Sequence, residues 1–184
     1  MQQRSERIIL GIDPGTSLMG YGAIRESGKK PEFIEMDVFD LKKSGDHYMK
    51  LRKIYEHTLV LIERYLPDEM AIEAPFFGRN VQSMLKLGRA QGVAIAAAIS
   101  RDVPVFEYAP RKIKLAITSA GNASKEQVAG MLARMFGLHE IPKNLDATDG
   151  LAVAVCHFYR KETYSRSVSA SWETYIRKNP GRVK

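Results

Sequence analysis

Residues 8–24 read IILGIDPGTSLMGYGAI, an aliphatic stretch that carries one carboxylate, Asp13, directly before Pro-Gly. Apolar runs bounded by Gly, Ser and Pro are typical of short β-strands joined by turns. A charge at the end of such a strand is unfavourable unless another group neutralises it. The stretch therefore predicts a sheet-based fold in which Asp13 meets a partner from elsewhere in the chain.

Strand-like and helix-like segments then follow in an order that indicates the fold class. Strands are expected at 8–13, 20–25, 32–39, 69–74 and 103–109, and the short links between the first three favour an antiparallel meander. Helical spacing of apolar residues predicts helices at 46–66, 81–100, 110–118, 124–137 and 146–160. The whole pattern predicts an α/β fold with one five-stranded mixed sheet flanked by helices.

Length and composition limit the class of protein. A chain of 184 residues, 45% of them hydrophobic, is expected to form one domain at 1–160, followed by a basic, flexible or weakly helical tail at 161–184. The start MQQRSER lacks the apolar segment of a secretory signal, and no apolar run approaches the roughly 20 residues of a membrane span. With a single cysteine, Cys156, these features predict a cytoplasmic protein.

The net charge of +7 is unevenly distributed along the chain. Residues 74–134 contain nine Lys and Arg against three Asp and Glu, and residues 160–184 contain seven against two. The intervening parts of the chain have an acidic excess. Basic segments of this kind either form an ordinary solvated surface or bind a polyanion, and nucleic acid is the main candidate for the latter.

Four acidic residues stand where local structure does not require them. Asp13 and Glu73 each end a predicted strand, and Asp146 and Asp149 lie three apart at the start of the last predicted helix. Each has a simpler explanation: a turn for Asp13, a solvated strand end for Glu73, and helix capping for the last pair. If the first and fourth strands are neighbours, however, all four carboxylates converge and repel one another unless cations neutralise them.

Ligand sets made of oxygen alone favour hard ions such as Mg²⁺, with Mn²⁺ as a substitute. Two such ions roughly 3.5–4 Å apart can activate a water molecule and stabilise a departing oxygen in phosphodiester cleavage. The sequence contains no His/Cys cluster with zinc spacing and no recognisable Ser-His-Asp set. We therefore expect Asp13 to hold metal.

Five segments in order, GIDPGT, GYGAI, AIEAPFFGRNVQSMLKLGRAQGVAIAAA, VPVFEYAPRKIK and DATDGLAVAVCH, resemble the RuvC family of bacterial Holliday-junction resolvases. The resemblance runs from about residue 8 to residue 158. It implies an RNase H-like fold, a homodimer, and metal-dependent cutting of two opposed strands of a four-way junction. It also implies work in recombination and repair alongside a branch-migration helicase.

The resemblance assigns roles to particular residues. Asp13, Glu73, Asp146 and Asp149 match the four acidic positions of the family, although some members have histidine where this chain has Asp146. Phe76 matches an aromatic residue that stacks on bases near the junction centre. The resemblance also implies that two lysines, Lys114 and Lys125, contact the scissile phosphate region.

The residues themselves leave more than one reading of these basic and aromatic positions. Phe76 either folds back onto the core or provides a stacking platform for an unpaired base. Further candidate DNA contacts from the basic segment are Arg79, Lys86 and Arg111. Lys125 is expected in the first turn of a helix, where a cation is mildly unfavourable unless an anion lies beside it.

Small residues recur every four positions in the helix expected at 81–100, at Gly88, Gly92 and Ala96. Such a stripe lets another backbone approach closely. It could pack against the protein's own sheet or against the same helix of a second subunit across a two-fold axis.

Three functions remain for comparison. The first is a structure-selective endonuclease that leaves 5′-phosphate and 3′-hydroxyl ends. In this function, Asp13 bridges two metal ions, Glu73 and Asp146 or Asp149 complete the ligand set, and Lys114 or Lys125 steadies the phosphate.

The second candidate function is an actin-like ATPase, because GIDPGT before a hairpin resembles a phosphate loop. The chain looks too short, however, for the two subdomains that such an ATPase requires. The third is a non-catalytic module that binds branched nucleic acid through its basic segments.

Overall fold

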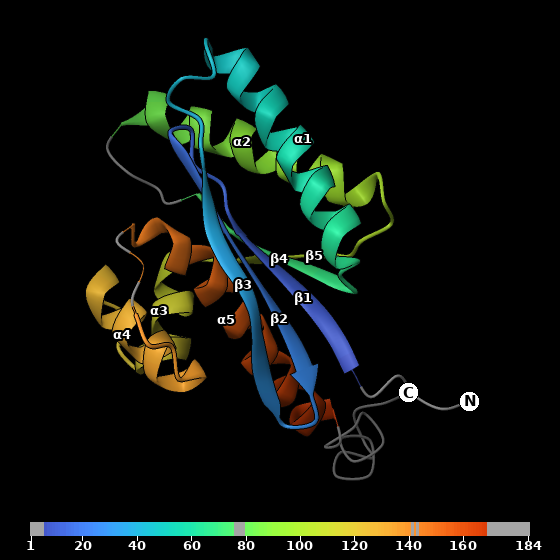
Figure 1. Ribbon diagram of the computed structural model, residues 1–184, viewed down its shortest axis with the longest axis vertical. Coiled ribbons are helices and arrows are strands. Elements are labelled where there is room, and N and C mark those ends of the chain that lie inside the picture. The colour runs from blue at the N-terminus through green and yellow to red at the C-terminus, as the bar shows by residue number, and fades with distance from the viewer. Residues whose placement is uncertain (1–5, 76–79, 141, 143, 169–184) are drawn as a thin grey trace, which may run out of the picture.

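A computed structural model describes residues 6–75, 80–140, 142 and 144–168 of the chain (Figure 1). These residues form five strands and five helices in the predicted order. The elements are β1 (Glu6–Asp13), β2 (Leu18–Ser27), β3 (Lys30–Asp40), α1 (His47–Tyr65), β4 (Glu69–Glu73), α2 (Val81–Ile99), β5 (Val105–Tyr108), α3 (Pro110–Thr118), α4 (Lys125–Phe136) and α5 (Asp146–Val168).

The strands form one mixed sheet in the order β3-β2-β1-β4-β5. The first three are an antiparallel meander, while β4 runs parallel to both β1 and β5. The first and fourth strands are therefore neighbours, which is the condition under which the acidic residues were expected to converge. Since Ile12 pairs with Ile72 in the parallel ladder, the next residues, Asp13 and Glu73, end their strands side by side.

Helices cover both faces of this sheet (Figure 1). α1 and α2 lie over one face, where they enclose a core containing Leu10 and Ile12. α3, α4 and α5 lie over the other, where Ile9 belongs to a second core with much of α5. Because successive side chains of a strand point to opposite faces, Asp13 follows Ile9 onto the α5 face.

Local signals set several of the element boundaries. Ser124 and Gln127 form a capping box at the start of α4, and Gly137 ends that helix in the left-handed conformation with φ 63°. At the other end of the chain, α5 continues to Val168, past the boundary expected at residue 160. The rest of the predicted tail, residues 169–184, lies outside the described residues.

The middle of α5 is more deeply buried than its sequence indicates. Cys156 and the polar His157 are both buried. The His157 ring meets the Tyr108 hydroxyl at 2.6 Å and Glu69 at 2.7 Å, and these partners allow a polar ring to be buried. In the described part of the chain, no helix has the length and hydropathy that a membrane crossing requires.

Candidate active site

A cavity of about 500 Å³ opens where β1, β4 and the start of α5 meet α3 and α4. Three of the four predicted acids line it, namely Asp13, Glu73 and Asp149. Three of the predicted basic residues line it as well, and these are Arg111, Lys114 and Lys125. The cavity thus has an acidic wall made by strand ends and α5 and a basic wall made by α3 and α4.

Glycines bring α5 into direct contact with the sheet and so bring Asp149 to the strand ends. A Cβ atom added to Gly22 would lie 2.4 Å from the Cα of Leu151, and one added to Gly150 would lie 2.4 Å from the Cα of Tyr21. Side chains at these positions would push the helix away from β2. This role was not predicted from the sequence, although the glycines inside the GYGAI and DATDG segments were a visible signal of it.

The two strand-end carboxylates lie partly buried without a described ion-pair partner, and this affects their titration. Burial, reinforced by the charge of Asp149, raises the pKa of Asp13 to about 7. Burial and the charge of Asp13 raise the pKa of Glu73 to about 8. Each carboxylate thus lacks the neutralising charge that its setting calls for, and a bound cation would supply it.

The helix pair has a counter-ion from within the protein, although burial still raises the pKa of Asp149. The Lys125 Nζ donates to Asp146 Oδ1 and to Asp149 Oδ2, each at 2.6 Å. Burial alone would lower the pKa of Lys125, but these two hydrogen bonds outweigh it and raise that pKa above its ordinary value. Asp146 therefore reaches the cluster through Lys125 and does not itself line the cavity.

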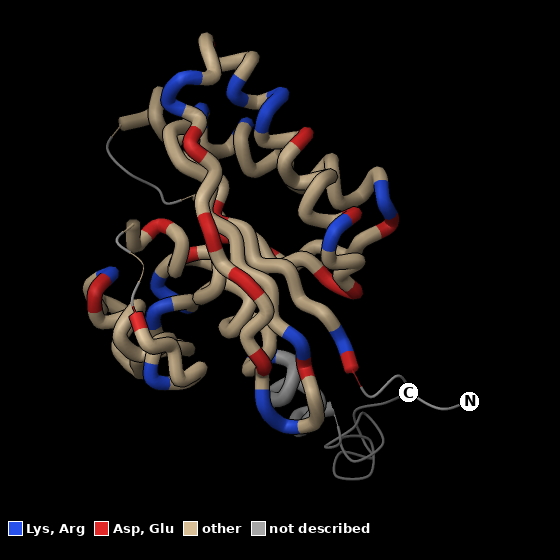
Figure 2. The backbone as a smooth tube through the Cα atoms, viewed as in Figure 1, with Lys and Arg blue, Asp and Glu red and all other residues tan. Residues whose placement is uncertain are grey.

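Acidic residues occur elsewhere, and burial distinguishes those of the cavity. Acidic positions also run along β3 at the sheet edge (Figure 2), where Glu32, Asp37 and Asp40 are exposed to solvent. Exposed carboxylates of this kind need no counter-ion. Charge content alone therefore does not mark the site.

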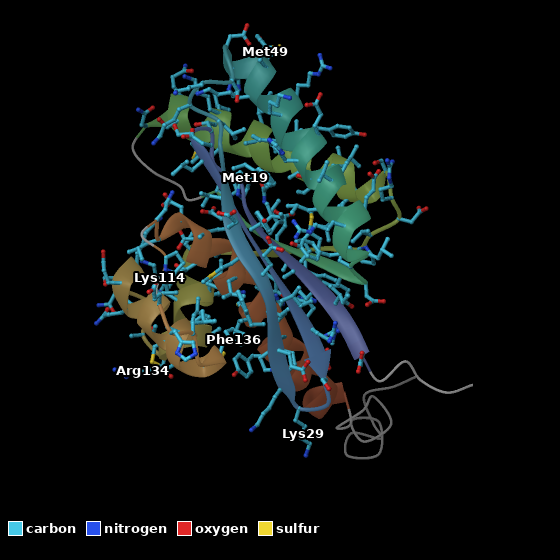
Figure 3. The ribbon with its side chains drawn as sticks, in the orientation of Figure 1. Met19, Lys29, Met49, Lys114, Arg134 and Phe136 are labelled. Carbon is cyan, nitrogen blue, oxygen red and sulfur yellow. The ribbon has the colours of Figure 1, made fainter. Side chains whose placement is uncertain are left out.

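The remaining predicted contacts fall in different places. Lys114 extends from α3 on the α5 side of the sheet (Figure 3). Lys86 is exposed on α2 and does not line the cavity. Phe76 and Arg79 lie outside the described residues.

The donor chemistry of the acidic wall fits a hard divalent cation, because the cavity offers carboxylate oxygens with raised pKa values. In the arrangement described, however, no group of three or more His, Cys, Asp or Glu side chains among the described residues is placed to hold a metal ion. The ammonium group of Lys125 lies between two of the four carboxylates instead.

Comparisons with known proteins agree with this geometry. The family described as "Crossover junction endodeoxyribonuclease RuvC" matches residues 9–157. A curated protein of that name from Bacteroides fragilis is 61% identical over 188 aligned residues, covering 100% of both chains. Another, from Cytophaga hutchinsonii, is 60% identical and covers 97% of this chain and 89% of its relative.

Solved structures give the same result at the level of the fold. Thermus thermophilus RuvC in complex with Holliday junction substrate aligns with a TM-score of 0.77 and 31% identity, covering 85% of this chain and 96% of that one. The yeast mitochondrial Holliday junction resolvase Ydc2 aligns with a TM-score of 0.58 at 15% identity, covering 82% and 78%, a likeness of fold alone.

Proposed function

The chain belongs to the RuvC family of crossover junction endodeoxyribonucleases, and from this premise we propose which of its residues bind metal and cut DNA. It is an α/β protein of the RNase H-like type and a metal-dependent nuclease that resolves Holliday junctions in DNA recombination and repair. The proposal concerns the roles of individual residues, the ions and the assembly.

Asp13, Glu73, Asp146 and Asp149 form the catalytic metal site in this proposal. The observation that carries it is the meeting of Asp13, Glu73 and Asp149 at one cavity, together with the raised pKa values of the first two. Carboxylates held in this state are stabilised by a nearby divalent cation. Asp146 joins the set once its hydrogen bond to Lys125 is released.

The ions are two Mg²⁺ per site, with Mn²⁺ as a substitute. Bound there, the pair would supply an activated water nucleophile and stabilise the charge on the leaving 3′-oxygen. The protein itself contributes orientation, because Asp13 and Glu73 extend from adjacent strands of a rigid sheet. A Mn²⁺ titration of the DNA-free protein is expected to give two ions per chain. A stoichiometry of one would contradict the proposal of a second ion.

The basic wall binds the DNA backbone. Arg111 and Lys114 line the same cavity as the carboxylates, so a phosphate bound there would meet these cations as well as the metal. Arg111 rests on Gly121, whose added Cβ would lie 2.7 Å from the Arg111 Cγ. Lys86, Phe76 and Arg79 are proposed as further contacts to the junction.

A nicking assay on synthetic four-way junctions tests these assignments. Wild-type protein with Mg²⁺ is expected to make paired nicks that leave 5′-phosphate and 3′-hydroxyl ends, while chelation and Asp13→Asn abolish cutting. Asp37→Asn is the matched control, because Asp37 is an exposed acid on β3. Undiminished cutting by Asp13→Asn would overturn the proposed site.

The enzyme acts as a homodimer joined through α2. The buried residues of this helix, such as Ala90, Ala94 and Ala98, face the protein's own core. An opposite stripe of Leu85, Gly88, Gly92, Ala96 and Ile99 is open or only partly covered, and a Cβ added to Gly88 or Gly92 would meet nothing within 4 Å. Of the two alternatives raised by the small residues, this exposure favours a second subunit.

Sedimentation velocity tests the dimer. Leu85→Arg places a charge in the stripe and is expected to shift the protein to monomers. Val60→Arg, at an equally exposed apolar position on α1, is expected to leave the dimer intact. A Leu85→Arg protein that stays dimeric would exclude this interface.

We also propose that residues 1–160 form the nuclease domain and that 161–184 act as a basic segment binding DNA or a branch-migration helicase in the cytoplasm. The core on the α5 face includes α5 residues up to Phe158, which supports this boundary. Replacing the cations at 177, 178, 182 and 184 by glutamine is expected to weaken junction binding and flatten its salt dependence. If the salt dependence of junction binding did not change, the segment would not contact DNA.

The two other candidate functions, a non-catalytic DNA-binding module and an actin-like ATPase, do not agree with these findings. A non-catalytic binding module does not agree with membership of an endonuclease family. An actin-like ATPase would need a second subdomain, whereas the described residues form a single five-stranded sheet.

A further inference from the structure

Lys125 has a setting unlike that of the other cations of the cavity. It begins α4, and the N-terminal end of a helix disfavours positive charge. The Ser124–Gln127 capping box satisfies this helix end, and a lysine ammonium, which has no acceptor, cannot bond its free N–H groups. Its Nζ instead donates to two acids of another helix, Asp146 and Asp149.

The other two basic residues of the cavity do not share this arrangement. Arg111 and Lys114 line the same cavity, yet within the described residues neither has a carboxylate oxygen within 4 Å of its charged nitrogens. Lys125 is half exposed, whereas the Asp149 side chain is 15% exposed. The cation that pairs with these two acids is therefore more exposed to solvent than either of them.

Among the described residues, no group of three or more His, Cys, Asp or Glu side chains is placed to hold a metal ion while Lys125 occupies this position. The oxygens that Asp146 and Asp149 would offer to a metal are engaged by an ammonium group, and that group and a divalent ion compete for the same charge. Resting on the proposed function, we propose that Lys125 is the resident counter-ion of the metal-free site, which a divalent ion displaces when it binds.

Displacement has a consequence for the substrate. Once released, the Lys125 ammonium remains at the edge of the cavity, on the wall that already holds Arg111 and Lys114. It is then free to meet a phosphate oxygen of the DNA backbone. Metal binding and phosphate binding are thereby linked through one side chain, since only the metal-loaded site has this cation available.

Removing the lysine should therefore strengthen metal binding by the DNA-free protein. In the wild-type protein, Mn²⁺ must break the two partly exposed ion pairs of Lys125 before it binds. Replacing the lysine removes this cost, and we expect Mn²⁺ affinity to rise about tenfold, or about 1.4 kcal/mol. The measurement is isothermal titration of full-length, DNA-free protein with Mn²⁺, comparing wild type with Lys125→Met.

Lys114→Met is the matched control, because it removes one positive charge from the same cavity without breaking a described ion pair. It is expected to raise Mn²⁺ affinity by about twofold, through the general loss of positive charge. A gain for Lys125→Met no larger than that for Lys114→Met would overturn the counter-ion role, and so would weaker binding.

Two further measurements separate this inference from the site itself. In chelator, the Lys125→Met protein should melt at a lower temperature than the Lys114→Met protein. Adding Mn²⁺ should then raise the melting temperature of Lys125→Met by more than that of Lys114→Met. Equal melting temperatures of the two variants would count against the counter-ion role. Asp13→Asn should lose Mn²⁺ binding whatever stands at 125. If Asp13→Asn binds like wild type, the metal site itself fails, and the counter-ion role fails with it.

Discussion

Asp13 and Glu73 lie at the ends of adjacent parallel strands, whereas Asp146 and Asp149 lie in the first turn of α5. The strand pair is partly buried without a described ion pair, and the pKa values rise to about 7 and about 8. The helix pair shares the Lys125 ammonium. The two pairs differ in how their charge is balanced, so a bound metal should matter most to the strand pair.

The largest expected effect separates the two pairs directly. Asp13→Asn should reduce junction cleavage by at least about a thousandfold, because it removes a fixed metal ligand at the centre of the cavity. Asp146→Asn should reduce it less, about tenfold, because this side chain is 32% exposed and joins the ligand set only after Lys125 releases it. Single-turnover cleavage in Mg²⁺ measures both, and equal losses would remove the distinction.

The next effect separates the pairs in space without changing a carboxylate. Gly150→Ala would place a methyl group against the Tyr21 backbone and push α5 from the sheet, which should lower the free energy of unfolding by about 3 kcal/mol. Gly130→Ala, in α4 with open space around it, should instead stabilise by about 0.5–1 kcal/mol. Urea unfolding compares the two, and a neutral Gly150→Ala would refute the close approach.

The strand pair should also give the metal-free protein an unusual pH dependence. A carboxyl group whose pKa is higher in the folded state binds protons more tightly there, so its contribution to stability falls as pH rises. Between pH 5 and pH 8.5 in chelator, the free energy of unfolding should fall on the order of 2 kcal/mol. Asp13→Asn should reduce the fall, whereas a stability that rises with pH would contradict the assignment.

The smallest effect concerns the basic wall alone. Arg111→Gln should weaken junction binding about threefold and lower the salt dependence by about one phosphate contact. Mn²⁺ binding by the DNA-free protein should change little, because Arg111 makes no described ion pair with the acids. Fluorescence anisotropy across a salt series measures the slope, and an unchanged slope would remove Arg111 from the DNA interface.

Much of the fold could be predicted from local patterns. The strand and helix order, the meander and the capping box at Ser124 depend on nearby residues, which the sequence displays directly. The meeting of Asp13 with Glu73 was predicted only on the condition that the first and fourth strands are neighbours, and the parallel pairing of β1 and β4 meets that condition.

Other features depend on contacts between distant segments. The close approach of α5 through Gly22 and Gly150 requires knowing that this helix crosses β2, which periodicity cannot indicate. Lys125 was expected to face a phosphate, whereas in the structure it pairs with acids that follow it by more than twenty positions. Likewise, His157 is buried only because Tyr108 and Glu69 supply partners from two strands.

The central claim is that these carboxylates share divalent ions in one cavity. Anomalous diffraction from a Mn²⁺-soaked crystal of the full-length protein tests it most directly. We predict two manganese peaks within the cavity, with oxygens of Asp13, Glu73 and Asp149 as ligands and the Lys125 ammonium moved away from Asp149. Carboxylates that remain apart with no manganese between them, or manganese bound only at other surfaces, would contradict it.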